Sequence, residues 1–153
     1  EDRVKYIKKL MPDACVGGDV IVGFPGEDVN EFDKTLQFIK NLDMSYLHVF
    51  PYSERVNTRA ISLNESVPIE ERNKRSKVLR LLSDKKKRYF YESNLNNVRN
   101  VLFENKVSGD FIYGFTDNYI KTKIKFNKEL VGKECTVLLK KVDDDLSVIG
   151  EIV

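Results

Sequence analysis

The feature that most constrains this chain is a change of hydrophobic period near residue 96. From Arg99 onward, apolar and polar residues alternate, and turn residues such as Ser108-Gly109-Asp110 interrupt the alternation. A period of two predicts strands that bury one face. The predicted strands are 101–104, 111–116, 119–126, 135–142 and 148–153. Five strands in about 55 residues predict a small, closed or nearly closed, OB-like barrel, because an open sheet would leave exposed edges.

Residues 1–67 have the order helix, strand, helix, strand. The Val- and Ile-rich run 15–24 ends at Pro25-Gly26, which indicates a parallel strand buried on both faces. An amphipathic helix follows over 28–41, and 46–50 predicts a second parallel strand. Two strands cannot close such a sheet, so we expect that further strands were removed or come from a partner. The start at Glu1, without Met, agrees with a cut chain.

A long basic helix is predicted over residues 68–95. Pro68 suits a helix start, and Glu70 and Glu71 stand in the first turn. The net charge is only +2, but residues 70–99 hold ten Lys or Arg against four Asp or Glu. Such uneven charge favours a nucleic-acid partner, although a solvated helix face is the plainer interpretation.

Cysteine usage and hydropathy exclude several classes of protein. Cys15 and Cys135 lie far apart and there is one His, so neither metal-ligand spacing nor a disulfide framework is present. Two reduced cysteines are typical of a cytoplasmic protein. No apolar run approaches about 18 residues, so we expect no membrane partner. Exposed strand edges in the incomplete α/β part predict self-association, rearrangement or partial disorder.

The third predicted strand of the barrel carries a regular set of lysines. Alternation places Lys121, Lys123 and Lys125 on one face, about 6.6 Å apart, which suits a single strand of nucleic acid. The nearby aromatic residues that could stack on bases are Tyr113, Phe115 and Tyr119. The alternative is an edge strand that uses lysines to prevent aggregation.

The segment 19–27 is the second candidate site. Asp19, Ile21 and Gly23 share one strand face, and the glycine would let a flat ligand approach the backbone. The second strand ends at 50–53, and ligands of α/β proteins gather at the carboxyl ends of strands. A βα turn without any ligand is the commoner outcome for such a sequence. The chain has no phosphate-loop GK[ST], no Ser/His/Asp set and no paired carboxylates.

These segments together resemble a known family. The sequences of 19–27 (DVIVGFPGE) and 46–53 (YLHVFPYS), with Arg55 and Thr58, resemble the last two barrel strands of the radical S-adenosylmethionine methylthiotransferases. The tail resembles their TRAM domain at 113–116, 118–119, 130–132 and 150–151. Residues 47–53 are most similar to the branch that acts on threonylcarbamoyl-adenosine beside the tRNA anticodon.

The resemblance implies an α/β fold followed by an all-β fold. Residues 1–67 would form the carboxyl-terminal part of a radical-SAM barrel, 68–95 a connecting helix, and 96–153 a TRAM barrel that holds tRNA. The family uses S-adenosylmethionine and two [4Fe–4S] clusters to replace a hydrogen by a methylthio group. The residues expected at S-adenosylmethionine are Asp19, Ile21, Gly23, Phe50, Tyr52, Ser53 and Arg55.

Two departures from the family pattern stand out. The CxxxCxxC cluster motif is absent, so we expect this chain alone to bind no cluster, to carry no catalytic residue and to be inactive. Asn57 stands where the family usually has glycine, and Asn tolerates a positive φ better than most residues. The alternatives left open are a stand-alone RNA-binding module and a methylthiotransferase that acts on isopentenyl-adenosine or on a ribosomal protein.

Overall fold

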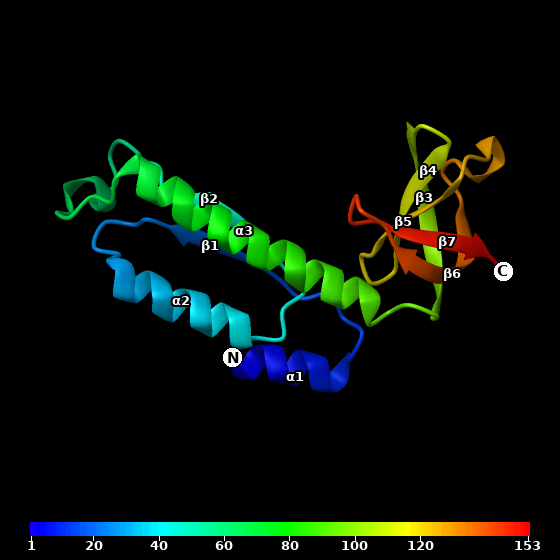
Figure 1. The fold of residues 1–153 in the computed structure, drawn as a ribbon, viewed down its shortest axis with the longest axis horizontal. Helices are drawn as coiled ribbons and strands as arrows, with labels where there is room; N and C mark the ends of the chain where they lie inside the picture. The colour runs from blue at the N-terminus through cyan, green and yellow to red at the C-terminus, as the bar shows by residue number, and fades with distance from the viewer. The chain divides into compact units, whose positions relative to one another are not determined.

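The computed structural model describes all residues 1–153 and divides them into two compact units. The first unit comprises residues 1–10 and 16–86, and the second comprises 11–15 and 87–153 (Figure 1). The first unit contains α1 (Asp2–Leu10), β1 (Gly17–Val22), α2 (Val29–Asn41), β2 (Tyr46–Pro51), a 3-10 turn η1 (Arg59–Ser62) and most of α3 (Ile69–Glu92). The second contains β3 (Val98–Ser108), β4 (Phe111–Thr116), β5 (Lys121–Lys125), η2 (Lys128–Leu130), β6 (Glu134–Val142) and β7 (Val148–Ile152).

The first unit is built on two parallel strands, as the sequence predicted. Gly17 pairs with Tyr46, and the register continues to Val22 opposite Pro51. Helix α2 begins after Asp28, whose carboxylate accepts a hydrogen bond from a backbone N–H of the first turn at 2.8 Å. The apolar residues at helical spacing on α2 then pack against the sheet. The shared core comprises Val22, Phe32, Ile39, Leu47, Val49 and Leu79.

Only one face of this sheet is buried, so the prediction of a strand buried on both faces is wrong. The inward positions of β1 and β2 contact helices α2 and α3 through the core just described. On the opposite face, Ile21 is 58% exposed and Phe50 is 50% exposed. This unit therefore covers only one face of β1, although the apolar run supplies apolar side chains to both faces.

The outer edge of β2 is closed by side chains of α3. The Ser83 hydroxyl accepts a hydrogen bond from the Leu47 N–H at 2.9 Å and donates one to the Leu47 carbonyl at 3.1 Å. Arg80 donates to the Val49 carbonyl at 3.3 Å. These bonds satisfy backbone groups that an edge strand would otherwise offer to another strand. Self-association by strand addition at this edge would have to displace them.

The second unit is a closed five-stranded barrel in the order β3-β4-β5-β7-β6, which confirms the five strands expected from the alternation. Four of the pairs are antiparallel and the β5–β7 pair is parallel. The first strand begins at Val98 and runs to Ser108, longer than predicted, with a register shift between Phe103 and Val107. A bulge of this kind lets one long strand bend around a barrel.

Two apolar clusters fill the barrel unit. One lies within the strands and comprises Val101, Phe103, Ile112, Ile124 and Val137. The other joins the last turns of α3 to the barrel and comprises Phe90, Tyr91, Ile120, Leu139, Val142 and Val148. The long helix thus ends as part of the barrel's core. No helix in the structure is both long and apolar enough to cross a bilayer.

Candidate functional site

The open face of the parallel sheet gathers several of the predicted ligand residues. In register, Asp19 lies opposite His48 and Ile21 lies opposite Phe50. Residues in register on neighbouring strands share a face, so these four side chains lie on the exposed side, with Asp19 and His48 in mid-strand and Ile21 and Phe50 near the carboxyl ends. Adjacent apolar side chains beside a carboxylate suit a ligand with a flat ring and polar substituents.

The remaining predicted ligand residues lie just beyond the strands. Tyr52 extends the pairing, because its N–H donates to the Val22 carbonyl at 2.8 Å. Its ring contacts the Phe24 ring edge-on at 5.2 Å between centroids, and its hydroxyl is buried without a hydrogen-bond partner. Ser53 and Arg55 are exposed on the following loop. Ser53 and Arg55 are therefore accessible to a ligand, whereas the Tyr52 side chain is packed against other side chains.

Gly23 has a different environment from the one expected. It is buried, with φ of 75°, and its N–H donates to Glu27 Oε1 at 3.1 Å. A Cβ at this position would lie 2.4 Å from Arg72 Cγ. The space beside the glycine is thus taken by a protein side chain, whereas the sequence predicted the approach of a ligand. The expected turn after Arg55 does form, and Asn57 adopts φ of 63°.

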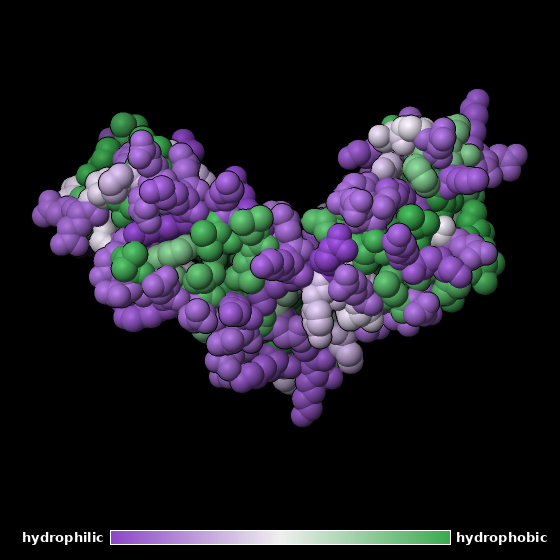
Figure 2. Space-filling view, viewed as in Figure 1, coloured by the Kyte–Doolittle hydropathy of each residue, from purple (hydrophilic) through white to green (hydrophobic).

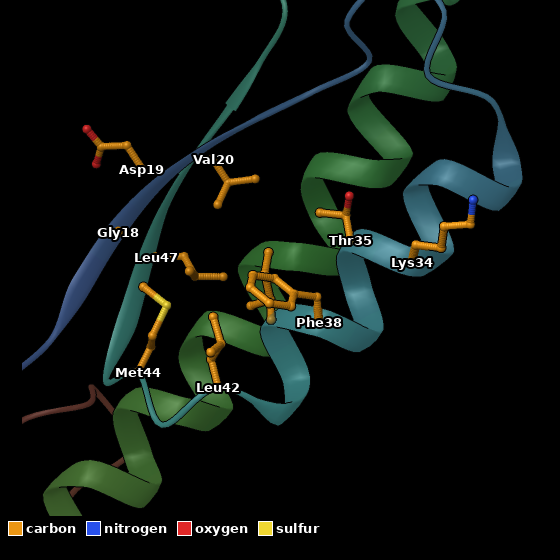
Figure 3. Close-up of a pocket in the computed structure, with 10 residues that line it drawn as sticks. Gly18, Asp19, Val20, Lys34, Thr35, Phe38, Leu42, Met44 and Leu47 are labelled. Carbon is orange, nitrogen blue, oxygen red and sulfur yellow. The ribbon is translucent and has the colours of Figure 1, made fainter. Parts of the chain in front are cut away.

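A separate pocket of about 470 Å³ lies on the other side of β1, against α2 (Figure 3). Val20, Leu47 and Phe38 point into it, whereas Asp19 points away from them. The pocket is thus lined mainly by the unit's apolar side chains. Among the predicted ligand residues, only Asp19 lines this pocket.

In the barrel, the three predicted lysines do not form one exposed strip. The alternation places Ile120, Thr122, Ile124 and Phe126 on the face opposite the lysines; the first three are buried, and Phe126 is 47% exposed. Lys123 is also buried, at 5% exposure, and its ammonium contacts the carboxylates of Asp143 and Asp145. Its charge is already paired, which leaves half-buried Lys121 and exposed Lys125 as the available cations of this strand.

The paired carboxylates give the barrel a testable acid sensitivity. Burial alone would raise the pKa of Asp145, but hydrogen bonds from Ser147, Lys123 and Tyr113 outweigh it and hold this pKa at about 2. Because the folded pKa lies below the ordinary 3.8, the stabilisation is present above pH 3.8 and is lost as the pH falls through about 2. We expect Asp145→Asn to destabilise the neutral protein by only about 1 kcal/mol, since the carboxylate is partly exposed.

Urea denaturation between pH 7 and pH 2 measures this effect. The variant should lose less stability than the wild type across the acid range. Asp144→Asn, at the exposed neighbour in the same turn, is the matched control and should leave both the midpoint and its pH dependence unchanged. Parallel pH profiles for wild type and Asp145→Asn would contradict the assignment.

The predicted aromatic residues divide into one packed and two accessible rings. Tyr113 is buried, its hydroxyl hydrogen-bonds Asp145 at 3.1 Å, and the Lys121 ammonium lies 4.8 Å from its ring centroid. Phe115 and Tyr119 stack at 5.0 Å, and Tyr119 is 61% exposed. Tyr119 also has φ of 68°, an unusual conformation for a bulky residue. Local strain of this kind is common at binding sites.

An apolar groove of about 630 Å³ lies on the barrel beside Lys125. Its lining residues are Phe111, Ile124, Lys125, Phe126, Asn127, Leu130, Ile149, Gly150 and Ile152. Apolar surface is visible on the barrel among polar side chains (Figure 2). No group of three or more His, Cys, Asp or Glu residues is placed to hold a metal ion.

Comparison with known proteins shows which family these features fit. No protein-family model matches the chain. It is 37% identical over 144 residues to the threonylcarbamoyladenosine tRNA methylthiotransferase of Bacillus subtilis. The aligned segment is 92% of this chain and 32% of the relative. The enzyme of the same name from Aquifex aeolicus is 38% identical over 141 residues, 91% of this chain and 32% of the relative. This chain is homologous over most of its length to tRNA methylthiotransferases of the radical S-adenosylmethionine family.

A second group of methylthiotransferases is also related. The tRNA-2-methylthio-N(6)-dimethylallyladenosine synthase of Endomicrobium trichonymphae is 33% identical over 150 residues, 98% of this chain and 35% of the relative. The chain spans about a third of the length of the curated methylthiotransferases that it matches. The homology confirms the family resemblance drawn from residues 19–27, 46–53 and the barrel.

Two residues beside the predicted ligand residues, His48 and Arg72, were not predicted from the sequence. His48 lies on the open face opposite Asp19, and the period of two that selected Phe50 selects His48 as well. Arg72 on α3 reaches the ends of both strands, as described below. Nothing in the sequence distinguishes it from the many other basic residues of that helix.

Proposed function

We propose that this chain acts as part of a tRNA methylthiotransferase that modifies a hypermodified adenosine next to the anticodon. In this assignment, residues 1–67 belong to the radical-SAM barrel, 68–95 connect, and 96–153 form the TRAM domain. The observation that carries the proposal is homology over 92% of the chain to an enzyme named for that reaction. The exposed strand face and the accessible aromatic rings of the barrel support it independently of that name.

The first unit would supply one part of the S-adenosylmethionine site. Ile21 and Phe50 would provide apolar contacts for the adenosine, and Asp19, Ser53 and Arg55 would provide polar ones. The bound S-adenosylmethionine, together with two [4Fe–4S] clusters, would supply the radical and sulfur chemistry. The chain has two cysteines and no CxxxCxxC motif, so we propose that cluster ligands come from outside it and that it is inactive alone.

Threonylcarbamoyl-adenosine is the substrate that the comparisons favour. Two relatives named for this base are 37% and 38% identical to the chain, whereas the Endomicrobium trichonymphae relative named for dimethylallyladenosine is 33% identical. The sequence of 47–53 favours the same branch. We therefore propose threonylcarbamoyl-adenosine in tRNA ahead of the dimethylallyl (isopentenyl) base.

The barrel would hold the tRNA through a smaller set of contacts than the sequence suggested. Phe115 and Tyr119 offer a stacked and accessible aromatic pair. Lys121 and Lys125 would contact phosphates, because their charges are not held by the Asp143 and Asp145 carboxylates. Aromatic stacking combined with nearby cations is a common means of binding single-stranded RNA.

A chimera tests the proposed function. This chain would replace the matching 144-residue segment of the Bacillus subtilis relative, and mass spectrometry of tRNA nucleosides would measure methylthio incorporation. We expect the chimera to methylthiolate threonylcarbamoyl-adenosine, because the segment would supply the same part of the pocket and the same RNA-binding domain.

The control is the relative without the segment, which should be inactive. A chimera that folds and binds tRNA but transfers no methylthio group would contradict the proposal. Product on dimethylallyladenosine alone would contradict the choice of substrate and leave the reaction class standing.

A further inference from the structure

Arg72 on α3 contacts the segment after β2, the segment just before α3 and the end of β1. Its side chain is 5% exposed. Its Nε donates to the Val67 carbonyl at 2.7 Å, and its Nη1 donates to the Tyr52 carbonyl at 2.9 Å. Its Nη2 donates to Glu54 Oε1 at 2.6 Å and to Ser66 Oγ at 3.0 Å. One side chain on α3 therefore holds the segment after β2 against the segment that precedes the helix.

The stem of the same side chain packs at the end of β1. It occupies the position where a Cβ of Gly23 would lie, 2.4 Å from Arg72 Cγ. The guanidinium lies 5.3 Å from the centroid of the Tyr52 ring, whose other neighbour is Phe24. Arg72 thus contacts the carboxyl ends of both strands, where Ile21, Phe50 and Ser53 lie nearby in sequence.

The electrostatics favour the contact between Arg72 and Glu54. The hydrogen bond from Arg72 holds the pKa of the Glu54 carboxyl below its ordinary value. A guanidinium presents donors in a fixed planar fork, so it fixes the direction of each acceptor, which a lysine ammonium does not. The four acceptors of Arg72 lie outside regular helices and strands, and among these residues the Tyr52 N–H also pairs with the Val22 carbonyl.

We propose that Arg72 is a positioning residue for the ligand face at the ends of β1 and β2. It would contact no ligand atom. It would fix the backbone of 52–54, and through it the side chains of Phe50 and Ser53, in the orientation that binds the adenosine part of the ligand. The inference rests on the proposed S-adenosylmethionine site and adds a residue that the family resemblance did not point to.

The test uses the chimera described above and measures the dissociation constant of S-adenosylmethionine by equilibrium dialysis. Arg72→Lys keeps the charge and loses the fork, and we expect roughly a tenfold rise of the dissociation constant, as misplaced binding groups typically cause. Glu54→Gln removes one exposed partner and should give a smaller rise in a variant that still folds. Affinity for tRNA should stay unchanged in both variants.

Arg75→Lys is the matched control. Arg75 is equally buried on the same helix, but it bonds Glu27 and Glu71 and makes none of the bonds to 52–54. It should lower the urea midpoint about as much as Arg72→Lys without changing the dissociation constant. Equal dissociation constants for the parent and Arg72→Lys, or equal rises for both arginine variants, would overturn the positioning role. A parent chimera that binds no S-adenosylmethionine would overturn the proposed site and this inference with it.

Discussion

Replacing Tyr91 with alanine is expected to lower the unfolding free energy of the barrel unit by about 3–5 kcal/mol. Tyr91 is 1% exposed and packs with Phe90, Ile120 and Leu139. Its hydroxyl accepts a hydrogen bond from the Lys121 N–H at 3.0 Å, and burial raises the pKa of Tyr91 to about 12. The substitution would leave a cavity and an unpaired backbone N–H at the start of β5, so both packing and hydrogen bonding are lost.

Two matched variants separate these contributions in urea denaturation followed by circular dichroism. Tyr91→Phe keeps the ring and removes the hydroxyl, so we expect a loss of about 1 kcal/mol. Tyr89→Ala removes a ring that is 71% exposed on the same helix and should be nearly neutral. Equal midpoints for Tyr91→Ala and Tyr89→Ala would show that the end of α3 is not part of the barrel's core.

Replacing Tyr119 with alanine is expected to weaken binding of single-stranded RNA by about 1–3 kcal/mol, the usual contribution of one stacked base. This corresponds to roughly a five- to 150-fold rise of the dissociation constant. Tyr119 is 61% exposed, and its inner face stacks on Phe115 at 5.0 Å, so its ring is supported and open to a base. Filter binding with a tRNA anticodon stem-loop measures the change.

Salt dependence distinguishes stacking from charge. Tyr119→Ala should shift the affinity without changing the slope of log K against log salt, and Tyr119→Phe should bind as the wild type does. Lys121→Ala and Lys125→Ala should each reduce the slope by about 0.7 for a single strand. If Tyr119→Ala leaves the affinity unchanged and the lysine variants leave the slope unchanged, this surface does not bind RNA. The lysines would then only prevent aggregation at a strand edge.

The periodicity of the sequence predicted the elements of both units. Alternation placed Ile120, Thr122, Ile124 and Phe126 on one face; the first three are buried, whereas Phe126, just past the end of β5, is 47% exposed. The order of elements in residues 1–67 predicted parallel strands, and β1 and β2 are parallel. Such predictions succeed because alternation and helical spacing are local properties of the chain, which the burial of one face selects directly.

Burial and charge pairing could not be predicted in the same way. The alternation placed Lys123 with Lys121 and Lys125, but closure of the barrel brings Asp143 and Asp145 from a distant turn against its ammonium. Similarly, the apolar run of β1 indicated two buried faces, and only one is covered here because no further element packs on the face of Ile21. Both outcomes depend on which segments meet in space.

The change of period near residue 96, together with the turn residues, determined a five-stranded sheet because side-chain alternation is set by the strand itself. Whether each polar side chain is exposed or paired with another part of the protein was decided only by the tertiary structure. Arg72 shows this most clearly: on the helix it is one basic residue among many, and its four hydrogen bonds arise only where loops from β2 and before α3 converge. The bonds to Tyr52 and Glu54 have no periodic signature, since they join residues 20 and 18 positions apart in the chain.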